Sequence, residues 1–203
     1  MGLFDWTYFL KKKDYQEEGF NPKGVKIGKM VSIDDIDANY NFTVDKIYQC
    51  KTQVGEYADY DIYAITSSGP LNAKLRVLEG KTLLLYEDFR TSFDESLYDV
   101  LTHPEFSLKV DDNEKDLHAE YFRPSNVRCE YSVDVVELDD KNKDGFVAYD
   151  ELKKSKIRLW DYERKIMVDG VSQKEYLFVE MDFNHFMTMY IGKEILPSKV
   201  NFY

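Results

Sequence analysis

Hydrophobic and polar residues alternate with a period of two along most of the chain after residue 25. The alternating segments are short, rich in aromatic and β-branched residues, and separated by turn-forming residues, a pattern typical of half-buried strands. The segments predicted to be strands are VKIGKMVSI at 25–33 and then 41–54, 57–66, 71–78, 81–89, 106–110, 117–122, 126–138, 156–168, 174–183 and 186–195.

The turn-forming residues between these segments favour hairpins. SSGP at 67–70, EG at 79–80 and DG at 169–170 are turn signals between consecutive strand patterns. Such spacing indicates an antiparallel meander. We therefore predict an α+β fold that is mainly β, with the meander forming a sandwich or an open barrel.

Two of the predicted helices lie before residue 106, outside the strand patterns. In residues 91–105, Thr91 or Ser92 can cap the first turn, Leu97 and Leu101 lie on one apolar face, and Pro104 ends the helix. Residues 1–13 (MGLFDWTYFLKKK) are predicted to form an aromatic N-terminal helix. A polar linker at 14–24 and a single β-rich domain at 25–203 complete the predicted organisation.

Composition narrows the classes of partner. The 203-residue chain has a formal charge of −11 and is 43% hydrophobic, enough for a packed core. So acidic a chain disfavours binding to nucleic acid and to anionic lipid. No apolar stretch reaches the length of a membrane helix. Any membrane contact is expected only through the N-terminal helix. We also expect a protein partner or self-association. The expected location is the cytoplasm, with Cys50 and Cys129 reduced.

The stretch DDKNKDGFVAYDEL at 139–152 carries the clearest chemistry. Calcium prefers six to eight oxygen ligands, and the pattern D-x-[DN]-x-[DN]-G-x5-E supplies them from one loop. The pattern is complete here, with Gly145 at the sharp turn. The predicted ligands are Asp140, Asn142, Asp144, the backbone carbonyl of Phe146, and Glu151 as a bidentate carboxylate.

Over residues 140–151 the sequence resembles the calcium loop of the EF-hand family, which implies a calcium site with these ligands. The flanks differ from that family. The preceding residues have the period of a strand, so the incoming helix is missing, whereas AYDELKKS (148–155) favours a short outgoing helix. A plain polar turn, built from the same residue types, is the alternative interpretation.

No enzyme signature accompanies this loop. His103, His118 and His185 lack the spacing of a zinc site, and no glycine-rich nucleotide motif occurs. Carboxylates are frequent in the strand patterns, but nothing selects a catalytic pair among them.

A second resemblance covers most of residues 24–195. GVKIGKMVSID, the meander YDIYAITSS…LRVLEGKTLLLYEDF, and WDYER…EYLFVEMDF look like an uncharacterised bacterial family of β-rich cytosolic proteins. This resemblance implies a strand-rich fold and no particular reaction.

The sequence thus predicts a non-enzymatic calcium-binding structural or interaction protein, in which the metal rigidifies a strand-to-helix connection. Two alternatives remain. One is a subunit of a larger assembly, docked through the N-terminal helix and tyrosine-rich strands, with calcium incidental. The other is a hydrolase acting on a polysaccharide or another polymer, with a structural calcium.

Overall fold

The computed structural model of the chain describes residues 25–34, 41–53, 55–78, 80–103, 108–112, 117–124, 130–138 and 153–203. The predicted N-terminal helix, the linker, Cys129 and the calcium-type loop at 140–151 lie outside these residues. Within them, no helix is long and apolar enough to cross a membrane.

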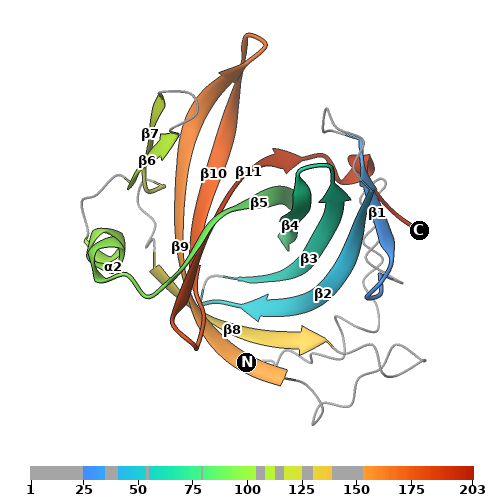
Figure 1. The fold of residues 1–203 in the computed structure, drawn as a ribbon, viewed down its shortest axis with the longest axis horizontal. Helices are drawn as coiled ribbons and strands as arrows, with labels where there is room; N and C mark the ends of the chain where they lie inside the picture. The colour runs from blue at the N-terminus through green and yellow to red at the C-terminus, as the bar shows by residue number, and fades with distance from the viewer. Residues whose placement is uncertain are drawn as a thin grey trace.

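The main body is an antiparallel sheet whose strands close into a ring of eight (Figure 1). Around the ring the strands are β2 (Asn41–Lys51), β3 (Glu56–Thr66), β4 (Gly69–Leu78), β5 (Lys81–Ser92), β11 (Phe186–Ile195), β10 (Val171–Met181), β9 (Lys153–Val168) and β8 (Glu130–Leu138). The pairing of β8 with β2 closes the ring. The antiparallel, mainly β prediction is confirmed. The predicted sandwich or open barrel is instead a barrel closed at this seam.

Two meanders of four strands build the barrel, β2 to β5 and β8 to β11. Because β11 pairs with β5 and β8 pairs with β2, the chain must cross from one side of the barrel to the other between the meanders. The crossing segment contains α2 (Glu95–Thr102) and the hairpin of β6 (Leu108–Asp112) and β7 (Leu117–Tyr121), which lie beside β9 in Figure 1.

One face of each ring strand points to a common interior. Buried residues of six strands form one apolar cluster there, although several of these strands are not neighbours in the sheet. Arg76 on β4 also reaches Glu180 on β10, across two intervening strands. The apolar members of the interior are Cys50, Tyr57, Leu83, Leu85, Val133, Val135, Leu159, Tyr176 and Phe178.

The outer face of the barrel is covered in two places. On β9, β10 and β11 it packs beneath α2, where Leu101 is buried beside Trp160 and Met181. On β2 to β5 it packs beneath β1 (Met30–Ile33) and β12 (Val200–Phe202), which extend the sheet beyond β2. These strands curl over the outer face, because the ring of Phe202 lies 5.9 Å from that of Tyr60 on β3.

Two local predictions are corrected. The helix predicted for 91–105 begins only at Glu95, because β5 continues to Ser92 in its pairing with β11, and Asp94 is the N-cap instead of Thr91 or Ser92. Its side chain accepts a hydrogen bond from the Leu97 amide at 2.9 Å. The outgoing helix predicted over 148–155 cannot include Lys153–Ser155, which already belong to β9 and pair with β8.

Gly192 on β11 marks a close approach of two strands. A Cβ atom at this position would stand 1.9 Å from the backbone carbonyl oxygen of Leu84 on β5. The backbone of two paired strands cannot move apart without breaking their ladder, so only glycine fits here.

We therefore expect Gly192→Ala to destabilise the barrel by about 3 kcal/mol, the upper part of the usual range for overpacking. Urea unfolding followed by tryptophan fluorescence measures this change. Gly55→Ala is the matched control, because its Cβ would meet no atom within 4 Å. Equal stabilities of the two variants would contradict the close approach.

Candidate functional site in the barrel interior

The predicted calcium ligands Asp140, Asn142, Asp144, Phe146 and Glu151 lie outside the described residues, but both ends of their connection are described. β8 runs to Leu138 and β9 begins at Lys153, and Glu137 pairs with Lys153 across the two strands. The prediction that a strand, not a helix, precedes the loop is therefore confirmed. In the described part of the chain, no group of three or more histidine, cysteine or acidic side chains is arranged to hold a metal.

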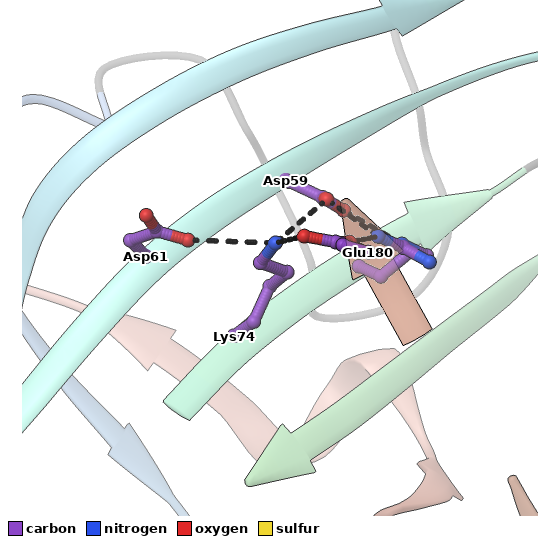
Figure 2. Close-up of polar contacts among 5 residues, drawn as sticks. Asp59, Asp61, Lys74 and Glu180 are labelled. Atoms are coloured by element: carbon purple, nitrogen blue, oxygen red, sulfur yellow. Dashed lines mark hydrogen bonds and ion pairs between the residues drawn. The ribbon is translucent and has the colours of Figure 1, made fainter. Parts of the chain in front are cut away.

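A network of charged side chains faces the barrel interior, and it is the candidate site in the described structure (Figure 2). Arg76 on β4 is at its centre and is 1% exposed. Its Nε and Nη2 atoms donate to the two carboxylate oxygens of Asp59 at 2.9 and 2.8 Å, and Nη2 also donates to Glu180. The Asp59 and Arg76 side chains meet because the β3–β4 register places these residues opposite each other.

Lys74 lies two residues earlier on the same face of β4 and is also buried. Figure 2 shows its ammonium group between Asp59, Asp61 and Glu180. Its Nζ donates to Glu180 at 2.6 Å and lies 3.5 Å from Asp59 and 3.9 Å from Asp61. Glu180 therefore bridges the two cations of β4 from the far meander.

Aromatic rings surround the two cations. The guanidinium of Arg76 lies between the rings of Tyr57 and Phe178, 4.5 and 4.7 Å from their centroids, and Lys74 lies 4.4 Å from the centroid of Tyr190. The faces of aromatic rings attract cations, more strongly when water is excluded. These contacts help to offset the loss of hydration that burial of both charges entails.

The acidic groups differ in the direction in which their pKa is shifted. Burial acts to raise the pKa of Asp59, but the charges and hydrogen bonds of Arg76 and Lys74 outweigh it and hold that pKa below its usual value. Burial raises the pKa of Asp61 to about 6; Asp59 and Glu180 add to this effect and Lys74 opposes it. Burial likewise raises the pKa of Asp161, on β9, to about 6.

Three polar atoms of the interior lack a hydrogen-bond partner although they are buried. They are Nη1 of Arg76, the hydroxyl of Tyr57 and Oδ1 of Asp161. The Asp161 residue pairs with Phe178, whose ring contacts the Arg76 guanidinium. Buried polar atoms without a partner cost about 1–3 kcal/mol each, so this part of the interior favours any change that supplies them with partners.

This arrangement is suited to holding strands together and to binding protons, and less to general acid catalysis. Asp59 and Glu180 are both bound to cations, and the cations hold the pKa of Asp59 below its usual value, whereas a general acid needs a raised pKa. The thiol of Cys50 is buried and free in the same interior, and burial raises its pKa, which makes it unreactive.

The sequence did not identify this network. In the sequence, Asp59, Asp61, Asp161 and Glu180 are among the frequent carboxylates of the strand patterns, and no motif marks them or their cationic partners. A usable signal was present: lysine and arginine alternate within the apolar strand LNAKLRVL, opposite the aspartates of YADYDIYAIT. Their burial depends on the barrel closing, which no local pattern shows.

No family model, curated protein or solved structure matches the chain in comparisons of its sequence and fold. The resemblances to the EF-hand loop and to a bacterial β-rich family remain predictions.

We expect Arg76→Met to destabilise the protein by about 3–5 kcal/mol, because it leaves Asp59 buried without its bidentate partner and takes one of two cations from Glu180. Urea unfolding gives the change in the free energy of unfolding. Lys156→Met is the control, since it breaks an ion pair with Asp134 in which both side chains are exposed, and about 1 kcal/mol or less is expected. Similar losses in the two variants would show that the interior network contributes no more than a surface pair.

Proposed function

We propose that this protein is a calcium-binding β-barrel that holds one Ca²⁺ ion in the connection between β8 and β9. The observation that carries the proposal is the complete ligand pattern from Asp140 to Glu151. It offers three carboxylates, one side-chain amide and one backbone carbonyl, all of them hard oxygen donors of the kind that calcium prefers.

The length of the connection supports the proposal. β8 and β9 are neighbours paired up to Glu137 and Lys153, and about two to five residues suffice to join such strands. The connection instead runs through residues 139–152. Long connections between adjacent strands commonly carry a function, and a bound ion would offset the entropy of ordering so many residues.

The proposed role of the ion is structural. A calcium switch of the EF-hand type works by changing the angle between two helices. Here a strand enters the connection and a strand leaves it, in the described residues on either side. The ion would hold the end of the β8–β9 hairpin, and β8 is also the strand that closes the barrel against β2.

Calcium is expected to raise the midpoint of thermal unfolding, because it binds the folded chain and scarcely the unfolded one. Glu151→Gln should lose most of this gain, since it removes the bidentate carboxylate. Asp139→Asn, which removes a carboxylate just outside the pattern, should retain it. Calorimetry with calcium and with a chelator makes the comparison. The proposed site is contradicted if calcium raises the unfolding midpoint equally in the wild type and both variants. It is also contradicted if calcium raises the midpoint in none of them.

Self-association is a second candidate function, and a group of exposed phenylalanines favours it. Four strand tyrosines, Tyr57, Tyr60, Tyr162 and Tyr176, are buried, whereas Tyr63 on β3 is exposed, so docking through tyrosine-rich strands stays a prediction. Phenylalanines are exposed instead near the β10–β11 turn, where the ring of Phe93 lies 6.3 Å from that of His185. Exposed apolar groups of this kind often mark protein interfaces.

We expect the wild-type protein to sediment as an oligomer and the variant Phe93→Ser/Phe183→Ser/Phe186→Ser to sediment as a monomer. All three rings are exposed, so the substitutions should leave the fold intact. Analytical ultracentrifugation measures the mass, and circular dichroism checks the fold. A monomeric wild-type protein contradicts self-association through this surface.

The hydrolase alternative has less support in the interior network. A glycosidase needs two carboxyl groups facing the substrate, one of them protonated. Asp59 and Glu180 are instead tied to Arg76 and Lys74, and we propose no reaction for them.

A further inference from the structure

The interior network contains more acid than base. Among the described residues of this network, four carboxyl groups, from Asp59, Asp61, Asp161 and Glu180, face the same interior as two cations, Lys74 and Arg76. Among the described residues, side-chain hydrogen bonds and the shortest ion pairs satisfy only Asp59 and Glu180. Asp61 and Asp161 are therefore in excess, and each ionised form adds a negative charge that no cation of the network meets at hydrogen-bonding distance.

Asp61 is held away from its nearest cation. Its carboxylate is 3.9 Å from Lys74, beyond hydrogen-bonding distance, while Lys74 donates to Glu180 at 2.6 Å. The side chain keeps 33% of its exposure, so protons can reach it from solvent. The charged or titratable groups that act on Asp61 come from β2, β3, β4, β10 and β11, and they are Lys46, Tyr48, Asp59, Lys74, Glu180 and Tyr190.

Asp161 lacks a cation of its own in the network for a different reason. Its Oδ1 atom is buried and receives no hydrogen bond, although Nη1 of Arg76 is also without a partner. The cation that acts on it from the interior is Arg76, which is already bound to Asp59 and Glu180. The other charged groups acting on Asp161 are Glu163 on its own strand and Arg123 beyond β7.

We propose that the barrel interior is a proton-responsive element, in which Asp61 and Asp161 each take up a proton as the solution becomes mildly acidic. At neutral pH both are ionised and the network carries two more negative than positive charges. After uptake the remaining charges balance, with Asp59 and Glu180 against Arg76 and Lys74. This proton uptake involves residues of the barrel strands β3 and β9, and it is independent of the proposed calcium connection.

The direction of the effect on stability follows from the number of protons bound. Both pKa values are higher in the folded protein, about 6, than the usual 3.8, so the folded state binds more protons than the unfolded state between these values. Stability from these two groups is therefore greatest in acid below their unfolded values and is lost as the pH rises through about 6. This is opposite to the effect of Asp59, whose pKa is lowered by its cations.

The position of the two groups indicates where the barrel responds. Asp61 stands on β3 and Asp161 on β9, and these strands flank β2 and β8 at the closing seam. At the seam, β2 pairs with β8 only from Ile47 to Lys51, whereas β9 and β10 pair along the whole of β10. Relief of the excess charge should therefore be most visible as slower hydrogen exchange at the seam, for example at Val136 opposite Gln49.

The experiment has two arms. First, ¹³C NMR of the side-chain carboxyl carbons follows the titration of Asp61 and Asp161 directly in the wild-type protein, and midpoints near pH 6 are expected. Second, urea unfolding at pH 7.5 and pH 5.0 compares the wild type with Asp61→Asn/Asp161→Asn. From pH 7.5 to 5.0 each group should shift the folding equilibrium toward the folded state by about tenfold or less, and the double variant should lose both shifts.

Asp134→Asn is the matched control, because it removes an exposed carboxylate from β8 at the end of the seam, where Asp134 pairs with Lys51. It should keep the pH dependence of the wild type. Asparagine resembles a protonated aspartate in shape and charge, so the double variant is expected to fold. Carboxyl midpoints near pH 4, or a double variant with the full pH dependence of the wild type, would overturn the proposal. The NMR arm needs no variant and decides the question even if the double variant does not fold.

Discussion

The bidentate pair of Arg76 and Asp59 is the interaction on which the rest of the barrel depends. A guanidinium that is 1% exposed can exist only where its counter-charges are fixed in place. Asp59 supplies one from the neighbouring strand, and Glu180 supplies the other from the second meander. The pair thus constrains both the β3–β4 register and the distance between the two halves of the barrel. A slip of one residue would turn Arg76 to the outer face and leave the two carboxylates without it.

This constraint explains why the barrel has apolar packing on both sides of its wall. The charged interior contributes specificity and little net stability, because buried ion pairs rarely repay their desolvation. Stability must come from the apolar interior around the network and from the two outer cores beneath α2 and beneath β1 and β12. Strands that are buried on both faces lose the alternation of a surface strand. Leu83, Leu84 and Leu85 on β5 are all buried, and Leu177 to Met181 on β10 are buried as well.

The sequence predicted the strands well because their signal is local. Period-two alternation and turn residues placed almost every strand, including the paired segments on both sides of residues 139–152. The closure of the barrel was not predictable in the same way, since nothing in β2 or β8 alone shows that they pair. The beginning of α2 was misplaced because Thr91 and Ser92 can cap a helix, and only their pairing with β11 keeps them in a strand.

The interior network illustrates the same limit for a functional site. Asp59 and Asp134 both alternate with apolar residues in strands, yet one is buried against Arg76 and the other is exposed beside Lys156. Their difference arises from which face of the sheet becomes concave, a property of the whole ring. Once that face is known, the excess of acid over base follows from composition alone. The same closure that buries Arg76 forces Asp61 and Asp161 into an interior with too few cations, so burial of the central ion pair and sensitivity to protons have one structural cause.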